Sequence, residues 1–172
     1  MRKLAALAPL LLMPFFATQA GSQSPAAPAE AHIAADLITR ADALKIVDGS
    51  LAACERLGEK AAAFVTDVDG NLRAALSSDG GNPIGLRTAT LKTATVLQFK
   101  SSTRALGERL KSNPAFAAQY GNDPRYFFHP GALPIYRDGK LVAVLAVGGG
   151  HDKDESCALE ALKLLPWART AP

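Results

Sequence analysis

The chain has 172 residues, 48% of them hydrophobic, which is enough for one domain with a sizeable core and too few for two. Its formal charge is +3, and removal of a leader that carries Arg2 and Lys3 but no acidic residue would lower the charge to +1. So small a charge, with no basic run or basic-aromatic patch, excludes nucleic acid from the expected partners.

The first 20 residues have the pattern of a secretory signal peptide. Arg2 and Lys3 precede an apolar stretch, residues 4–16, and small residues then lead to a predicted cleavage site after Ala20. A membrane anchor is the alternative, but a spanning helix needs about 20 apolar residues and this stretch is shorter and contains two prolines. We therefore expect a periplasmic or secreted protein with no membrane attachment after cleavage.

Residues 21–35 are small, polar and proline-containing, which is typical of a flexible linker. From Asp36 to Leu57, apolar residues recur every three or four positions, which predicts a helix of about six turns that ends at Gly58. The folded domain is expected to cover residues 36–166, followed by a short tail, residues 167–172.

Two pairs of strand-like runs predict β-hairpins, because each pair flanks an Asp-Gly turn signal. Asp69-Gly70 separates residues 61–68 from 72–78, and Asp138-Gly139 separates residues 132–137 from 141–147. The last of these runs is apolar on both faces, so we expect it in the centre of the sheet.

Helices are predicted between and after the hairpins. Residues 79–85 are expected to form a loop, followed by a helix over about 86–100 and a shorter one to about 111. Residues 113–131 combine turn formers with aromatic residues and predict a long connection with one helical turn near Ala115, the kind of loop that often carries function. A last helix over about 152–165 completes an α+β domain, since hairpins imply an antiparallel sheet that helices must cover.

Cys54 and Cys157 lie in the first and last predicted helices. If these helices pack side by side on one face of the sheet, the two cysteines meet, and an oxidising compartment favours a disulfide between them. Two buried free thiols are the alternative.

Three glycines, Gly148 to Gly150, follow the predicted central strand. The lysine and hydroxyl of a phosphate-binding loop and the βαβ context of a dinucleotide site are missing, so both kinds of site are excluded. Asp152 is expected to cap the last helix, with Glu155 at the spacing of a capping box. The glycines then allow the chain to turn sharply out of the sheet, or they let a flat ligand or a partner chain approach the backbone.

Three segments of the chain have a recognisable order and spacing: FVTDVDGNLRAALSSDG (64–80), LKTATVLQFKSST (91–103) and GALPIYRDGKLVAVLAVGGGHDKDESCALEAL (131–162). Together they resemble the GlcG/HbpS haem-binding (haem-degrading) family, and the likeness extends from about Asp36 to Leu165. The resemblance implies a profilin-like or PAS-like antiparallel sheet flanked by helices, assembly into homo-oligomers and, in some members, export and haem binding. The chain departs from the family pattern at Ala132, Val144 and Ala146, where bulkier residues replace small ones.

A non-covalent haem needs an axial ligand, an apolar slot and cations for its propionates. His129 is the candidate iron ligand, with Tyr126, Phe127 and Phe128 beside it as candidate walls, and an ordinary loop histidine is the alternative. The resemblance also implies Thr103 as an iron contact. By charge alone, Lys92, Arg87 and Arg104 are candidate propionate partners, unless they only form the solvated face of a helix.

Other sites have less support. His32 lies in the linker, His151 is expected to be solvated, and the histidine spacing does not suggest zinc. No GxSxG motif occurs, and we assign no catalytic residue. We therefore expect an exported protein that sequesters or senses haem, with haem degradation as a side activity. The alternative is a non-enzymatic module of the same fold for another small planar ligand or a partner protein.

Overall fold

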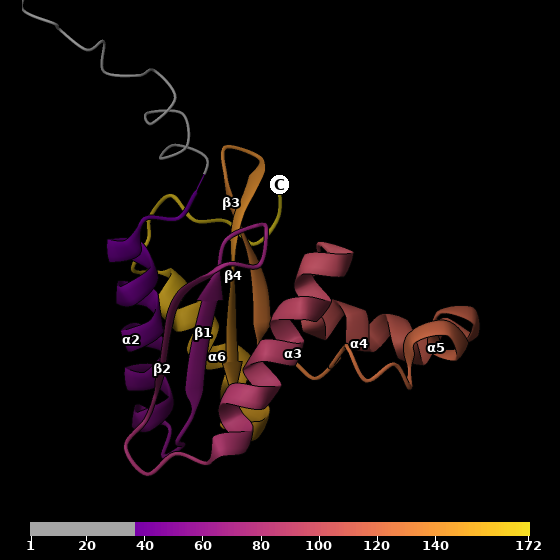
Figure 1. The fold of residues 1–172 in the computed structure, drawn as a ribbon, viewed down its shortest axis with the longest axis horizontal. Helices are drawn as coiled ribbons and strands as arrows, with labels where there is room; N and C mark the ends of the chain where they lie inside the picture. Colours follow the sequence, from indigo (N-terminus) through magenta and orange to yellow (C-terminus); the bar gives the residue numbers. More distant parts are fainter. Residues whose placement is uncertain (1–36) are drawn as a thin grey trace, which may run out of the picture.

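The computed structural model describes residues 37–172, so the predicted signal peptide (1–20), the linker (21–35) and His32 lie outside the described residues. A four-stranded antiparallel sheet in the order β2-β1-β4-β3 occupies the centre of the domain (Figure 1). Its strands are β1 (Ala62–Thr66), β2 (Leu72–Ser77), β3 (Ala132–Arg137) and β4 (Lys140–Gly148). Both predicted hairpins are present, and the α+β fold class is confirmed.

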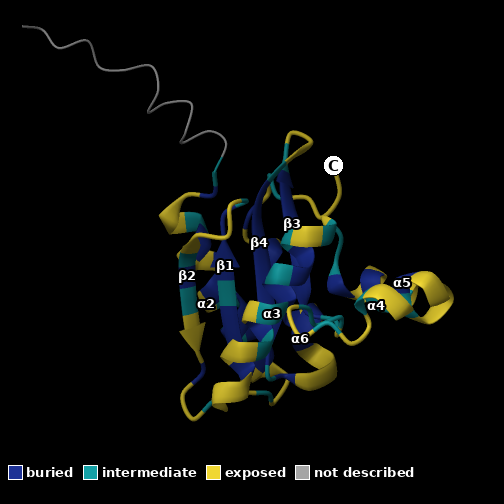
Figure 2. Cartoon of the chain, turned by 45° about the vertical axis from the view of Figure 1, so that its right-hand side comes forward, coloured by how far each residue is buried: buried dark blue, intermediate teal, exposed yellow. Residues whose placement is uncertain are grey.

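Strand β4 lies inside the sheet, as its apolar sequence predicted. It pairs with β1 on one side and with β3 on the other, and residues 142–148 are all buried. Figure 2 shows this buried centre and the more exposed outer helices. Within residues 37–172, no helix is long and apolar enough to cross a membrane.

Helices α2 (Arg40–Arg56) and α6 (Asp154–Leu162) pack side by side on one face of the sheet (Figure 1). Thr39 caps α2, since its Oγ1 accepts a hydrogen bond from Asp42 N at 3.1 Å. The predicted disulfide between Cys54 and Cys157 is confirmed, and both half-cystines are fully buried in this layer. The layer is otherwise aliphatic and includes Ile46, Val47, Val65, Ile135, Leu145 and Leu162.

Helix α3 (Pro83–Phe99) covers the opposite face of the sheet. The predicted end of the loop over residues 79–85 is wrong, because residues 83–85 already form the first turn of this helix. Asn82 caps it, with Oδ1 accepting from Ile84 N at 3.0 Å, and Pro83 suits the first helical position, where no donor is needed. The Cα atoms of α3 and β4 can approach closely because residues 85 and 148 are glycines: a Cβ on Gly148 would clash with the Gly85 carbonyl oxygen and with Thr88 Oγ1.

Two shorter helices extend from the end of α3 away from the sheet (Figure 1). Lys100 adopts a left-handed conformation (φ 54°) and ends α3, and α4 (Thr103–Ser112) and α5 (Pro114–Tyr120) follow. The helical turn predicted near Ala115 is therefore a helix of seven residues. Five aromatic rings pack against one another between α3, α5 and the loop before β3, and they belong to Phe99, Phe116, Tyr120, Tyr126 and Phe128.

The capping box predicted for the last helix is wrong. A 3-10 helix (His151–Lys153) precedes α6, and Lys153 occupies the N-cap position without a side-chain cap. The acidic residues have other partners: Asp154 Oδ1 accepts from Gly150 N at 2.8 Å, and Glu155 is paired with Arg104. Tertiary contacts at this helix start therefore replace the local hydrogen bonds that the spacing suggested.

Candidate functional site

A pocket of about 320 Å³ lies where the first half of α3 meets the loop before β3 and the turn between β4 and α6. Three separate parts of the chain supply its walls, so the pocket exists only in the folded domain. The lining residues are Asn82, Ile84, Thr88, Lys92, Phe127, His129, Gly149, His151 and Asp154.

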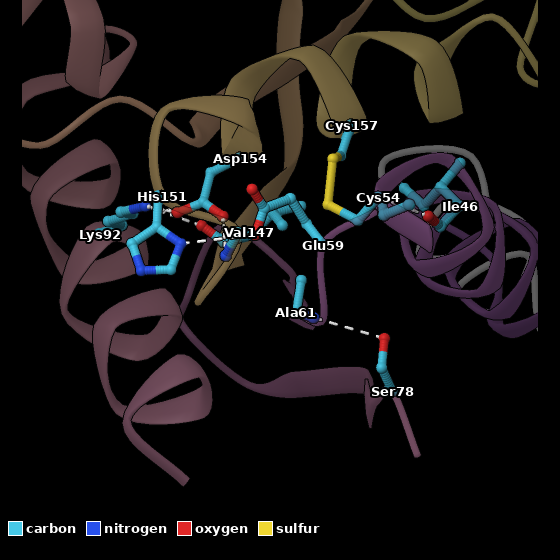
Figure 3. The surroundings of a disulfide bond; sticks show 12 residues. Ile46, Cys54, Glu59, Ala61, Ser78, Lys92, Val147, His151, Asp154 and Cys157 are labelled. Carbon is cyan, nitrogen blue, oxygen red and sulfur yellow. Dashed lines mark hydrogen bonds and ion pairs between the residues drawn. A yellow bond between two sulfur atoms is a disulfide. The ribbon is translucent and has the colours of Figure 1, made fainter. Parts of the chain in front are cut away.

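A buried ion pair forms the floor of this pocket. Lys92 is only 1% exposed, and its Nζ donates to Asp154 Oδ2 at 2.5 Å and to the Val147 carbonyl at 2.9 Å (Figure 3). A Cβ at residue 131 would lie 2.6 Å from Nζ, and Gly131 has a φ of +134°, so glycine is required there for two reasons. The pair thereby joins α3 to the start of α6 across the end of β4.

Burial opposes the charged form of both partners. It lowers the pKa of Lys92, while the carboxylates of Asp154 and Glu155 oppose that shift. It also raises the pKa of Asp154, against the opposing effects of Lys92 and of the Gly150 N–H. Each charge is therefore retained through the other, and the two groups are expected to titrate as one coupled unit.

An imidazole and an aromatic ring stand at the mouth of the pocket. The rings of His129 and Phe127 are stacked, with centroids 5.6 Å apart and an interplanar angle of 18°. Thr95 on α3 fixes this loop, because its Oγ1 accepts from Phe127 N at 2.8 Å and donates to the Leu91 carbonyl. His129 is exposed, so its ring can reach a ligand without a rearrangement of the core.

The second histidine of the pocket is arranged differently. His151 is exposed, as expected from the sequence, and its Nδ1 lies 3.4 Å from Glu59 Oε2. A left-handed φ of 52° places it in the turn after the three glycines. Of the three glycines, Gly148 allows the close approach of α3, whereas Gly149 has a φ of +98° and lines the pocket.

The structure brings together only part of the predicted haem site. Lys92 and His129 line one pocket, whereas Arg87 lines a separate depression on the outer side of α3. Thr103 is fully buried outside both linings, and its Oγ1 accepts from Ala132 N at 3.0 Å. Phe128 packs into the aromatic cluster, as does its neighbour Tyr126, so Phe127 is the member of this trio that lines the pocket.

The positions that depart from the family pattern are buried and do not line the pocket. Ala132, Val144 and Ala146 are fully buried beneath Ala89 and Val96 of α3. They fill that part of the interface, and the open space begins beyond them, at the Gly149 end.

The sequence interpretation did not find Asp154, Thr88 or Ile84 as lining residues. The available signal was indirect: a lysine on the buried stripe of a helix requires a carboxylate partner somewhere in the fold. For Lys92, that partner is 62 residues away in the sequence.

This arrangement suits a flat ligand with an acidic group. Phe127 offers an aromatic face, His129 offers an imidazole nitrogen, and Lys92 offers a cation at the floor. A porphyrin supplies most of the ligands of its own iron, so one imidazole is sufficient to hold it. Within residues 37–172, no group of three or more His, Cys, Asp or Glu side chains could hold a free metal ion.

Comparison with known proteins supports a relationship to haem proteins. Residues 38–163 match the family model described as haem degrading protein HbpS-like. No curated protein shows significant similarity to this sequence. A crystal structure of HbpS is 28% identical, with a TM-score of 0.66, over 75% of this chain and 90% of that chain.

Two further solved structures have the same fold. A double mutant of Streptomyces reticuli HbpS is 26% identical, with a TM-score of 0.66, over 94% of this chain and 99% of that chain. A PduOC–haem complex has a TM-score of 0.71 at 16% identity, over 79% of this chain and 99% of that chain. Because the family model covers most of the sequence, the chain belongs to the HbpS-like family of haem-degrading proteins.

Proposed function

We propose that this protein is exported and binds haem non-covalently in the pocket between α3 and the β4–α6 turn, where it sequesters or senses haem. The observation that carries the proposal is the convergence of His129, Phe127 and Lys92 on one pocket. Membership of the HbpS-like family supports it, as does the PduOC relative that was solved as a haem complex.

Each of the three side chains has a role in this proposal. His129 would hold the iron, because an exposed imidazole nitrogen is a common haem ligand. Phe127 would supply an apolar contact to the bound group, and its stacking on His129 holds the two side-chain rings in place. Lys92 is the cation for a propionate. Bound haem would supply redox chemistry at its iron, and haem degradation is then a side activity of the bound state.

Export and assembly belong to the same proposal. The leader pattern of residues 1–20 supports a periplasmic or secreted location, and a disulfide is compatible with that oxidising environment. We further propose that the protein forms a homo-oligomer, and that the domain of residues 36–166 is the unit that assembles. Thr103 and Arg87 are weaker candidates for haem contacts, since one is fully buried and the other lines a different depression.

A second candidate function rests on the size of the pocket. A volume of about 320 Å³ is at the small end of the range for small-molecule sites, about 300–1,000 Å³. This size favours a binding module for a smaller planar ligand, with the same aromatic wall and the same cation but without iron.

Hemin titration, followed by the Soret band, separates the two candidates. The mature protein is expected to shift the band with saturation near one hemin per chain, and His129→Ala is expected to abolish most of the shift. His151→Ala is the matched control, because it removes the other exposed histidine of the pocket. A shift that survives the combined replacement of His129 and Thr103 would exclude both candidate ligands, and no shift at all would favour the second function.

A further inference from the structure

The charges at the floor of the pocket are already paired, and this sets a condition on any ligand that reaches them. A lysine ammonium group has three N–H donors. Lys92 Nζ directs one to Asp154 Oδ2 and one to the Val147 carbonyl, and the third has no hydrogen-bond partner among residues 37–172. Lys92 lines the pocket although its side chain is only 2% exposed, so an acceptor on a ligand has to reach the floor to bind that third donor.

A ligand carboxylate at this donor would share Lys92 with the carboxylate of Asp154. Both Lys92 and Asp154 are at least 95% buried in their side chains, so little water is present to screen two adjacent negative charges. Lys92 supplies one positive charge for two carboxylates, so the buried site would carry a net negative charge unless one of the carboxylates takes up a proton. Asp154 would keep its hydrogen bond from Gly150 N through Oδ1, which leaves Oδ2 to carry the proton.

The other charged groups around this floor do not balance the charge of the second carboxylate. Glu155 is paired with Arg104, and His151 is exposed and lies next to Glu59. His129 lines the same pocket at its mouth. The groups that face or surround the pair are therefore His129 on the loop before β3, His151 on the 3-10 helix, Glu155 on α6, Arg104 on α4 and Glu59 after α2.

We infer that the pocket takes ligands that bear a carboxylate, and that the Lys92–Asp154 pair takes up one proton from solvent when the carboxylate binds. The inference rests on the proposed function, because a haem propionate is the carboxylate in question. The proton adds to Asp154 Oδ2, which changes from an acceptor for Lys92 to a donor toward the ligand, and Lys92 keeps its charge and pairs with the ligand.

The direction of the pKa shifts agrees with this geometry. Burial raises the pKa of Asp154, so its carboxylate is closer to protonation than an exposed one before any ligand is bound. Linkage then requires tighter binding at lower pH, by at most about tenfold per pH unit for one proton. Protonation of a ligating histidine has the opposite sign, because an imidazolium cannot bind iron.

The test compares hemin with hemin dimethyl ester, whose propionates carry no charge. Dissociation constants are measured from the Soret band between pH 6.5 and 8.5 on the mature chain. The variant is Lys92→Gln combined with Asp154→Asn, because removal of one partner alone would leave a buried unpaired charge. Asp152→Asn is the matched control, since it removes an exposed carboxylate from the same turn.

For the wild-type protein and Asp152→Asn, we expect hemin to bind more weakly as the pH rises, with a change of several-fold up to about tenfold per unit. The ester and the double variant are expected to show no such dependence. Hemin binding with the same pH dependence in the double variant, or for the ester, would overturn this inference and leave the haem proposal intact. No Soret shift in any protein would overturn the haem proposal itself, and this inference with it.

If the double variant does not fold, the wild-type protein is sufficient for the test. Proton uptake is then measured directly by the pH change on mixing in weak buffer. About one proton per hemin and none per ester would support the inference, and equal uptake for the two ligands would overturn it.

Discussion

The two faces of the sheet are built on different principles. The face under α2 and α6 is covered by a large aliphatic layer and closed by a buried disulfide. The face under α3 has a small core of Ala89, Val96, Ala132, Val144 and Ala146, and beside it a glycine contact and a buried ion pair. The difference teaches that one face is sealed by apolar packing and a disulfide, whereas the other is held by polar and backbone contacts beside the proposed haem pocket, and each prediction below tests that division.

The largest expected effect is on the disulfide face. Replacing both Cys54 and Cys157 with alanine opens a covalent loop whose ends are 103 residues apart in sequence. The chain-entropy model gives a loss of about 4–5 kcal/mol in the free energy of unfolding for a loop of that length. Urea unfolding measures the loss, and reductant on the wild-type protein should reproduce it. Hemin affinity of the folded protein should change little, and a tenfold weaker affinity would contradict the division.

On the α3 face, Lys92→Met is expected to reduce the free energy of unfolding by about 3–5 kcal/mol, because it leaves Asp154 buried without its cation. Burial raises the pKa of Asp154 and Lys92 opposes that shift, so removing Lys92 raises this pKa further and the native variant binds the proton more readily than the wild type does. The loss should therefore become smaller as the pH falls. Urea unfolding at pH 5 and pH 8 tests this, and an equal loss at both values would show that Asp154 does not carry the effect.

A smaller loss is expected at the contact between α3 and β4. Gly148→Ala would place a methyl group against Thr88 Oγ1 and the Gly85 carbonyl, and such overpacking costs about 1–3 kcal/mol. Because α3 must move, hemin should also bind more weakly. Gly139→Ala is the control for affinity: its left-handed φ of 76° makes the substitution costly in stability, but its Cβ would have no neighbour within 4 Å and it lies in the turn between β3 and β4. Equal hemin affinity in the two variants would show that the glycine contact between α3 and β4 does not influence hemin binding.

The smallest expected effect is at a helix cap. Asn82→Ala and Asn113→Ala each remove a side chain that caps a helix, α3 in one case and α5 in the other. Each substitution is expected to cost about 1 kcal/mol of stability. Only Asn82 lines the pocket, so only its variant should alter hemin affinity, as measured by Soret titration. A similar change in both variants would mean that binding follows overall stability.

The disulfide face could be predicted from the sequence, because periodic apolar residues specify helix faces and strand positions. The pairing of Cys54 with Cys157 followed from placing the first and last helices together, and the central position of β4 from its apolar sequence. The position of β4 depends on a pattern within one element, and the disulfide adds only the expectation that the first and last helices share one face of the sheet.

The α3 face could be predicted only in part, because its main contacts join distant residues. Lys92 and His129 were found by residue type, but Asp154 was assigned to no contact and Asp152 was given the cap instead. Nor could a pattern show that Thr103 turns inward to bond Ala132 or that Phe128 joins an aromatic cluster. These placements depend on how α3, α4 and the loop before β3 pack together. The spacing of residues within one element does not predict that packing.

One titration tests most directly whether haem binds in the Lys92 pocket rather than elsewhere on α3. Ile84 and Leu86 are both exposed on this helix, but Ile84 lines the Lys92 pocket and Leu86 lines the depression of Arg87. A glutamate at either position adds a negative charge that repels the propionates. The account predicts that Ile84→Glu weakens hemin binding at least about tenfold, or about 1.4 kcal/mol, and that Leu86→Glu leaves it unchanged. Weakening by Leu86→Glu alone, or equal weakening by both, would contradict it.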